Sequence, residues 1–410
     1  MLLASPQATR WLDDDTHRLF LAEDARRQFA FFRHSLRADG GFHQLDVDGT
    51  PRPTQVQELH ATTRMIHSFA LGKLAGLDKG DDMIAHGLSY LGAGHHDAQY
   101  GGYIWARDGK DISDGRKLAY GHVFVLLAAA SAHAAGHSTA LGLLDQADQV
   151  LTQRFWEEDH GLFADEWNRD WTPFSSYRGM NANMHGVEAL LAAFEATGRK
   201  HFLKRAGRIL SFFMDTIAPQ YDWRIPEHYT ADWQVDPAYA GDPMFRPAGH
   251  TPGHSVEWAR LWLQYGALTG TDVEDGARKI VYRALHDAWD ESRGGGLIYT
   301  LDFDGQPAIR DRYWWPVTEA IGVLAALLKT GGTAEDEAWY HKMWQFADAH
   351  LIDHNQGGWF PELDDDNRPK ARQFAGKPDI YHALQADILP LLPERANIYD
   401  GLRALIPPKL

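Results

Sequence analysis

The sequence contains no cysteine. This absence excludes disulfide bonds, thiol nucleophiles and thiolate metal sites. Basic residues are also scarce relative to acidic ones, because 40 Lys and Arg stand against 56 Asp and Glu and give a formal net charge of −16. An acidic surface repels nucleic acid and anionic lipid headgroups, so we expect no nucleic-acid partner and no membrane partner.

Long apolar runs are missing as well. No stretch approaches the roughly 20 apolar residues of a transmembrane helix. Residues 1–11 lack the basic and apolar regions of a secretory signal, and no glycine-rich phosphate-binding loop is evident. These absences predict a cytoplasmic protein that works without a nucleotide. They do not indicate its oligomeric state.

An aromatic residue, usually preceded by glycine, recurs along the chain. The six positions are Phe42, Tyr103, Phe163, Trp223, Tyr299 and Trp359, with gaps of 61, 60, 60, 76 and 60 residues. Regular spacing of this kind is the signature of a repeat architecture. Several positions are followed by a tight-turn signal, namely Asp48-Gly49, Asp108-Gly109, Asp304-Gly305 or Asp366-Asn367. These signals predict short β-hairpins in the connecting loops.

Apolar residues with helical periodicity fill the stretches between these positions. They predict twelve helices, over residues 12–34, 57–73, 79–92, 117–134, 139–155, 182–197, 199–217, 254–269, 272–288, 316–329, 334–351 and 379–391. Two helices per repeat, six times, predict a ring of helical hairpins with an inner and an outer layer. We expect residues 1–410 to form one domain.

Polar residues gather at the start of the second helix of each pair. They are His60 and Arg64; Tyr120 and His122; Asn181, Asn183, His185 and Glu188; His254 and Glu257; Trp315 and Glu319; and Asp379 and His382. The first helices of the pairs show no such enrichment. If the second helices form the inner ring and run in the same direction, these side chains converge on one central polar site.

The stretch GHTPGHSVEW (249–258) contains the most explicit chemistry. A helix that begins near Pro252 places His254 and Glu257 on one face of its first turn. Such a pair can serve in general acid–base catalysis, in helix capping or in metal binding. The spacing is not that of the paired-histidine zinc motif, so we expect no metal.

Five stretches together resemble the N-acylglucosamine 2-epimerase superfamily, and most of all its mannose isomerase and sulfoquinovose isomerase branch. They are ELHATTRM (58–65), YRGMNANMH (177–185), GHTPGHSVEW (249–258), WPVTEA (315–320) and DIYH (379–382). They follow one another in order over nearly the whole chain. The resemblance implies an all-α (α/α)6 barrel, no metal or other cofactor, and an isomerase that acts on a free monosaccharide by proton transfer.

The resemblance also implies roles for particular residues. His382 corresponds to the main base, His254 to its acid–base partner, and Glu257 to the group that orients His254. The predicted substrate-binding residues are Arg64, His185, Asn181, Glu319, Tyr120, Trp315 and His60. Among these, Arg64 supplies a permanent cation and Trp315 a surface on which a sugar can stack.

The substrate is predicted from one departure from the resemblance. Pro361 and Pro378 stand where glutamines are expected near a sulfonate. Proline cannot make those polar contacts, which favours D-mannose, converted to D-fructose, with D-lyxose as a second substrate. The alternatives are a 2-epimerase of N-acylglucosamine or cellobiose, a sulfoquinovose isomerase, an inverting glycoside hydrolase, and a non-catalytic binding barrel.

The irregular stretch 229–252 accounts for the one long gap between repeats. It is rich in proline, glycine and aromatic residues. A long segment without regular structure in a compact domain is usually functional. Two interpretations remain open, a roof over the mouth of the ring or a decoration of the surface.

Overall fold

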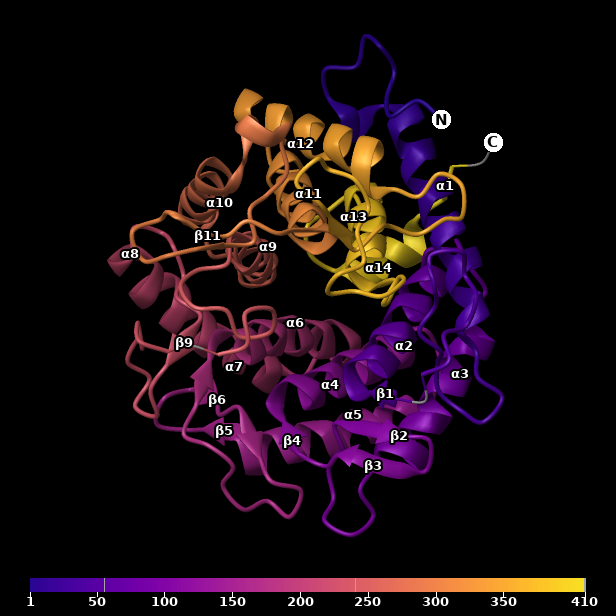
Figure 1. The fold of residues 1–410 in the computed structure, drawn as a ribbon, viewed down its shortest axis with the longest axis vertical. Coiled ribbons are helices and arrows are strands. Elements are labelled where there is room, and N and C mark those ends of the chain that lie inside the picture. Colours follow the sequence, from indigo (N-terminus) through magenta and orange to yellow (C-terminus); the bar gives the residue numbers. More distant parts are fainter. Residues whose placement is uncertain (55, 240, 409–410) are drawn as a thin grey trace.

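Two concentric layers of helices make up the computed structural model, which describes residues 1–54, 56–239 and 241–408 (Figure 1). The inner layer consists of α2 (Leu59–Leu74), α4 (Ala119–Ala134), α6 (Met180–Thr197), α9 (Pro252–Thr269), α11 (Trp314–Leu328) and α13 (Tyr381–Leu391). Each inner helix contacts the next, and α13 contacts α2, so the ring closes on itself.

The outer layer supplies one helix to each inner helix. It consists of α1 (Asp15–Phe32), α3 (Asp81–Tyr90), α5 (Ala140–Val150), α7 (Lys200–Leu210), α10 (Glu274–Ala288) and α12 (Ala334–Phe346). Outer α3, α5, α7, α10 and α12 each pack on the preceding inner helix, and α1 packs on α13. The predicted (α/α)6 barrel is thereby confirmed.

The two layers differ in burial because they have different surroundings. Every residue of α11 is buried, since other helices surround it. In α10 the buried residues are Ala277, Ile280, Val281, Ala284, Leu285 and Ala288, which lie on one face. An apolar stripe at this spacing is typical of a helix with one face on the core and one in water. No described helix is both long and apolar enough to cross a membrane.

Short antiparallel strands lie in the loops at one end of the barrel, where some pairs join consecutive repeats and others form hairpins within one loop. The pairs are β1 (Val56–Glu58) with β2 (Ala106–Asp108), β2 with β3 (Asp111–Asp114), β4 (Lys117–Leu118) with β7 (Glu166–Trp167), β5 (Trp156–Glu157) with β6 (Leu162–Phe163), β8 (Arg178–Gly179) with β9 (His228–Tyr229), β10 (Thr300–Leu301) with β11 (Pro307–Ile309), and β12 (Arg312–Tyr313) with β13 (Glu362–Leu363). The predicted turns are confirmed, since Gly49, Gly109, Gly305 and Asn367 all have positive φ.

A recurring ion pair holds the loop after an outer helix against the strand or loop that leads into the next inner helix. The pairs are Asp97–Lys117 (2.9 Å), Asp290–Arg312 (3.3 Å) and Asp353–Lys377 (2.7 Å). All six side chains are buried. A buried ion pair adds little net stability but fixes geometry, because either charge left alone is costly. These pairs hold the starts of the inner helices in place around the mouth.

Two further helices were not predicted. The short α8 (Ala218–Gln220) continues the end of α7, and α14 (Ile398–Ala404) follows the last inner helix. Helix α14 contacts α2 and α6, and the Tyr399 hydroxyl lies 2.9 Å from Oγ of Ser131 near the end of α4. Helix α14 therefore packs where the inner helices end, at the opposite end of the barrel from the mouth.

A buried carboxyl pair joins α1 to α13 and predicts how stability depends on pH. Burial and the neighbouring Asp24 raise the pKa of Asp387 well above its ordinary value. Oδ2 of Asp387 accepts a hydrogen bond from Gln28, and Oδ1 has no hydrogen-bond partner among the described residues. The folded state therefore retains a proton that the unfolded chain releases above about pH 4. The stabilisation is complete at low pH and is lost as the pH rises through the raised pKa.

Asp387→Asn should remove this pH dependence, since its amide can donate permanently to Asp24. We expect the variant to be more stable than the wild type at pH 8 by about 1 kcal/mol or more, and to gain little at pH 4.5. Urea unfolding at both pH values measures this difference. An equal change in the free energy of unfolding at the two pH values would show that Asp387 and Asp24 do not share a proton.

Candidate active site

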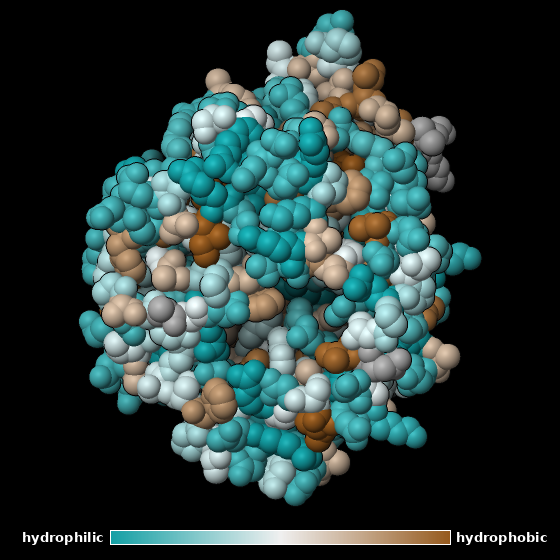
Figure 2. Space-filling view, viewed as in Figure 1, coloured by the Kyte–Doolittle hydropathy of each residue, from teal (hydrophilic) through white to brown (hydrophobic). Residues whose placement is uncertain are grey.

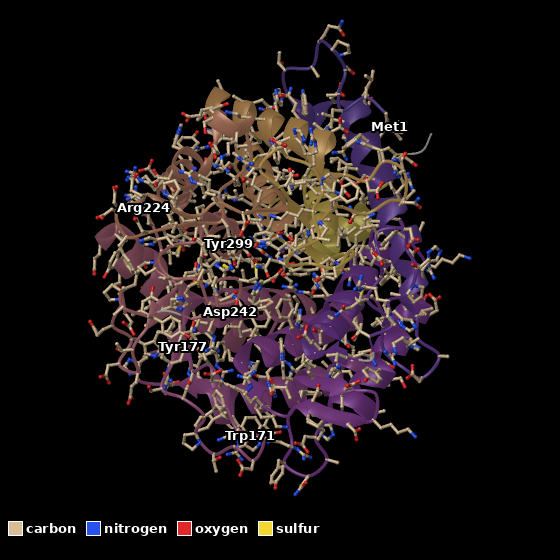
Figure 3. The ribbon with its side chains drawn as sticks, viewed as in Figure 1. Met1, Trp171, Tyr177, Arg224, Asp242 and Tyr299 are labelled. Carbon is tan, nitrogen blue, oxygen red and sulfur yellow. The ribbon has the colours of Figure 1, made fainter. Side chains whose placement is uncertain are left out.

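Figure 2 shows a hollow near the centre of the face of the molecule that is turned toward the viewer. Segment 229–252 lies on this face, and its Asp242 lies near the middle together with Tyr299 (Figure 3). The Tyr299 hydroxyl donates a hydrogen bond to the Met244 carbonyl, and Arg246 pairs with Glu166 of β7 at 2.8 Å. This placement supports the roof interpretation over a decoration remote from the mouth.

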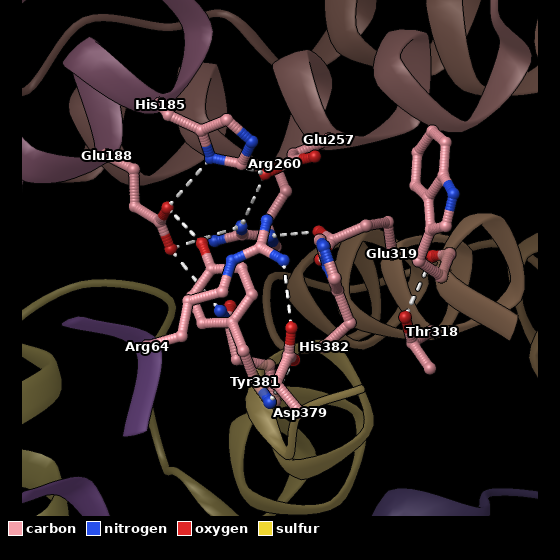
Figure 4. Close-up of polar contacts among 12 residues, drawn as sticks. Arg64, His185, Glu188, Glu257, Arg260, Thr318, Glu319, Asp379, Tyr381 and His382 are labelled. Carbon is pink, nitrogen blue, oxygen red and sulfur yellow. Dashed lines mark hydrogen bonds and ion pairs between the residues drawn. The ribbon is translucent and has the colours of Figure 1, made fainter. Parts of the chain in front are cut away.

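His382 lies at the start of α13 and is held by one carboxylate. Its Nδ1 lies 2.8 Å from Oε1 of Glu319 in α11 (Figure 4). A carboxylate at Nδ1 keeps the proton on that nitrogen and leaves Nε2 with a lone pair. Burial lowers the pKa of His382, and the Glu319 hydrogen bond opposes this effect. The ring is therefore presented as a neutral base.

His254 has a similar arrangement with a different carboxylate. Its Nδ1 lies 2.9 Å from Oε1 and 3.1 Å from Oε2 of Glu227, in the loop before β9. Oε1 of Glu227 also accepts the backbone N–H of Thr251 at 3.1 Å. The carboxylate that contacts His254 in this structure is thus Glu227 and not Glu257, the residue expected to orient it. Glu257 points toward α6, and no described hydrogen bond or ion pair joins it to His254.

Trp315 lies between the two histidines. Its ring centroid is 4.8 Å from that of His254 and 5.9 Å from that of His382. The three rings form one wall, built from the first turns of α9, α11 and α13. Two imidazoles separated by an aromatic surface can act on neighbouring atoms of a ligand that stacks on the tryptophan.

Glu257 lies below this wall, beside His185. It is fully buried, and its Oε1 is 3.5 Å from Nδ1 of His185. Neither carboxylate oxygen has a hydrogen-bond partner among the described residues. Burial, followed by the charge of Glu319, raises the pKa of Glu257 well above its ordinary value. These two effects favour the protonated form of Glu257.

His185 and Glu188 form the next part of the floor. Nδ1 of His185 lies 3.3 Å from Oε2 of Glu188, which also accepts the Tyr381 hydroxyl. Burial lowers the pKa of His185 to about 4. Burial raises the pKa of Glu188, but His185 and Arg260 outweigh it and hold that carboxyl below its ordinary pKa. Glu188 is therefore ionised and His185 neutral.

Arg64 and Tyr120 form the opposite wall. The Arg64 guanidinium donates to Oδ2 of Asp379 at 3.0 Å and to the Tyr120 hydroxyl at 2.9 Å. It also lies 4.8 Å from the ring centroid of Phe124 and 4.7 Å from that of Tyr381. These contacts on several sides hold the cation rigidly at the site.

His60 and Asn181 lie in the first turns of α2 and α6, and each has an unused polar atom. His60 stacks on Trp105 at 5.1 Å, and burial lowers its pKa to about 3. Nδ1 of His60 and Oδ1 of Asn181 have no hydrogen-bond partner among the described residues. Buried polar atoms normally find partners, so both are available to a ligand.

Two polar residues from the same helix starts have structural contacts instead. Nε2 of His122 accepts the backbone N–H of Tyr103 at 3.0 Å, and Asn183 bonds the backbone of Phe163 at 2.8 and 3.1 Å. Both therefore fix the position of the helix start against the preceding loop rather than face the site.

Sequence reasoning missed Glu227 and Arg260. Glu227 lies 27 positions before His254. A bridge between Pro226 and His250 and the hydrogen bond from the Glu227 N–H to the Gly249 carbonyl bring the two residues together. Arg260 lies in α9, and its Nε donates to Oε2 of Glu319 at 3.0 Å. The signal that could have identified Arg260 is a cation between the apolar residues Ala259 and Leu261 of a buried helix, because a buried charge needs partners.

One group of described residues has the composition of a metal site. Ligand atoms of His185, Glu188 and Glu257 lie within 4.8 Å of one another. However, Nη2 of Arg260 lies 3.8 Å from Glu257 and 3.9 Å from Glu188. A guanidinium already supplies the positive charge at this position, and it would repel a divalent ion. The donor set therefore fits a metal poorly.

Comparison with known proteins places the chain in a family. The model of the N-acylglucosamine 2-epimerase family matches residues 40–386. A D-mannose isomerase of Thermobifida fusca is 41% identical over 402 residues, which cover 96% of this chain and 99% of the relative. A D-mannose isomerase of Pseudomonas cannabina pv. alisalensis is 36% identical over 405 residues, with coverages of 96% and 97%.

Solved structures agree with this placement. A crystal structure of D-mannose isomerase superposes with a TM-score of 0.86 at 32% identity and covers 95% of this chain and 99% of its own. The cellobiose 2-epimerase of Spirochaeta thermophila has a TM-score of 0.81 at 21% identity, with coverages of 94% and 98%, and shows the shared fold alone. The chain belongs to the N-acylglucosamine 2-epimerase family, and it is an isomerase.

Proposed function

We propose that the protein, as one catalytic domain, interconverts D-mannose and D-fructose, with D-lyxose and D-xylulose as a second pair. The observation that carries this proposal is the pair of histidines on either side of Trp315, each held through Nδ1 by a buried carboxylate. The relatives named D-mannose isomerase support the choice of sugar.

The proposed reaction moves two protons within the sugar, and no electrons pass to or from a cofactor. His254 first assists ring opening by exchanging a proton with the ring oxygen. Nε2 of His382 then removes the proton from C2 of the open-chain aldose while protonated His254 donates a proton to O1, which gives an enediol. His382 returns its proton to C1 as the hydroxyl at C2 gives its proton back to His254, and a 2-ketose results. A histidine suits both steps because its pKa allows it to accept and return a proton.

The other predicted residues have supporting roles in this proposal. Arg64 stabilises the negative charge that develops on O1 and O2, as a fixed cation in a water-poor site does best. Trp315 stacks on the sugar, and Glu319 and Glu227 keep the two imidazoles in the reactive tautomer. The predicted hydroxyl-binding residues are His60, Tyr120, Asn181 and His185.

Charge pairing around the site favours an uncharged substrate. Arg64 is paired with Asp379 and Arg260 with Glu319, both at 3.0 Å. At the mouth, Arg246 is paired with Glu166 at 2.8 Å. A phosphate or sulfonate would have to displace one of these carboxylates, which is costly for a buried pair. A free neutral sugar meets no such barrier.

Incubation of the purified protein with D-mannose in deuterated water, followed by NMR, tests the proposed function. Fructose with deuterium at C1 is the expected product, because the histidine proton exchanges with solvent. Unlabelled fructose would indicate a shielded proton or a hydride shift. Early glucose without fructose would indicate 2-epimerisation, and absence of any product would refute mannose as the substrate.

Chelation should leave the reaction unchanged. Because Arg260 and Arg64 already supply positive charge in the site, we expect the kcat of protein dialysed against EDTA to equal that of untreated protein. Assays before and after dialysis measure this. A loss of activity that Mn²⁺, Co²⁺ or Zn²⁺ restores would contradict the metal-free mechanism.

A further inference from the structure

Arg260 lies at the centre of the site floor, where it connects three inner helices. It is almost fully buried and faces one carboxylate from each of α6, α9 and α11. The distances are 3.9 Å to Glu188, 3.8 Å to Glu257 and 3.0 Å to Glu319. Only the Glu319 contact is a hydrogen bond, and Nη2 has no hydrogen-bond partner among the described residues.

The contact with Glu319 extends to the proposed catalytic base. Glu319 uses Oε2 to accept Nε–H of Arg260 and Oε1 to accept Nδ1–H of His382, at 3.0 and 2.8 Å. Both oxygens of this one carboxylate are thus engaged by donors on fixed helices (Figure 4). A carboxylate clamped at both ends cannot rotate, so the imidazole that it holds cannot rotate either.

The guanidinium also sets the charge that His382 experiences. Without it, three buried carboxylates would face one another across the floor, and their repulsion would favour protonation of each. With it, Glu319 stays ionised and part of its charge is neutralised on the side away from His382. The His382 imidazole then faces a hydrogen-bond acceptor that carries only part of a full negative charge.

We propose that Arg260 is a positioning residue that fixes the orientation and the protonation of His382 through Glu319. This inference rests on the proposed function, since it takes His382 as the base. Among the described residues, the charged or titratable groups that face the His382 ring are Glu319 of α11, Arg64 of α2, Asp379 just before α13, Tyr381 of α13 and His185 of α6. Arg260 acts on the first of these.

The Glu319–His382 pair should bind a proton more tightly when Arg260 is replaced. The loss of a nearby positive charge stabilises the protonated imidazole beside its carboxylate. The form of His382 that can remove a proton from C2 is then reached only at higher pH. The acid limb of the profile of kcat/KM against pH should therefore move upward in Arg260→Gln by on the order of one pH unit.

Three variants separate positioning from structure. Arg260→Gln removes the charge, and Arg260→Lys keeps the charge but loses the planar Nε–H donor. Arg278→Gln is the matched control, because Arg278 of α10 pairs with Glu274 and Asp336 at 3.0 and 3.1 Å far from the site. We expect kcat at pH 7 to fall at least 10-fold in Arg260→Gln, with KM little changed, and to remain at the wild-type value in Arg278→Gln.

The lysine variant keeps the test decisive if the glutamine variant does not fold. We expect Arg260→Lys to fold, to lose kcat and to keep its acid limb within a few tenths of a pH unit of the wild type. Wild-type kcat and acid limb in the folded Arg260 variants would overturn the proposal. An effect of Arg260→Gln matched by Arg278→Gln would also overturn it, since that result would reflect stability alone.

A second measurement does not depend on any activity. In protein labelled with ¹⁵N-histidine, the His382 signals are identified by their absence in His382→Ala, and their titration follows the ring directly. We expect the titration midpoint of His382 to rise in Arg260→Gln. If mannose is not a substrate but this midpoint rises, the proposed function fails and the positioning role stands. An unchanged midpoint overturns the positioning role.

Discussion

His382→Ala should lower kcat for mannose isomerisation by on the order of 10³-fold or more, because the proposed mechanism has no other base at C2. The side chain is nearly buried and its Nδ1 bonds Glu319. Its removal leaves a small cavity, and Glu319 keeps its ion pair with Arg260. We therefore expect the fold to persist. Steady-state kinetics and thermal unfolding of the same preparation measure the two effects separately.

A graded series makes this test sharper. Glu319→Gln keeps a hydrogen-bond acceptor near Nδ1 but removes the charge, so its kcat should lie between those of the wild type and His382→Ala. His201→Ala serves as the control, since that histidine lies on outer helix α7 and pairs with Asp148 at 2.9 Å. Near-wild-type turnover in folded His382→Ala would remove this residue from the mechanism.

The barrel could be predicted from the sequence because each repeat carries its own local signals. Four of the five gaps between the aromatic positions are 60 or 61 residues long. Each of the first five positions is followed by two stretches with helical periodicity, and Trp359 is followed by one, 379–391, which pairs with 12–34. A helical pair cannot bury its apolar face alone, so six equivalent pairs favour a closed ring. Helix α14 was missed because Ile398–Ala404 is only seven residues long and belongs to no repeat.

Most of the candidate site could also be predicted, since its residues lie at equivalent positions of successive inner helices. In the structure His382 bonds Glu319, and Arg64 bonds Tyr120. The ring of Tyr120 in turn contacts that of His185. The prediction failed where a contact depended on tertiary structure. Glu227 belongs to a loop, and its position beside His254 depends on how the chain returns after segment 229–252.

The assignment of Glu227 in place of Glu257 leads to the second large expected effect. His254→Ala should lower kcat by on the order of 10²-fold or more, because the proposed acid–base partner is lost. Glu227→Gln should approach this loss. The carboxylate accepts both Nδ1–H of His254 and the backbone N–H of Thr251, whereas an amide presents one acceptor and one donor and therefore favours the wrong tautomer.

The same experiment discriminates between the two glutamates. Glu257→Gln should leave His254 correctly oriented, since Glu257 contacts His185 instead, and its neutral amide resembles the protonated carboxyl that burial favours there. We therefore expect a smaller loss of kcat in Glu257→Gln than in Glu227→Gln. The double variant Glu227→Gln/His254→Ala should be no worse than His254→Ala, because two residues that act as one unit are not additive. If Glu227→Gln has wild-type kcat while Glu257→Gln matches His254→Ala, then Glu257 is the residue that orients His254 during turnover.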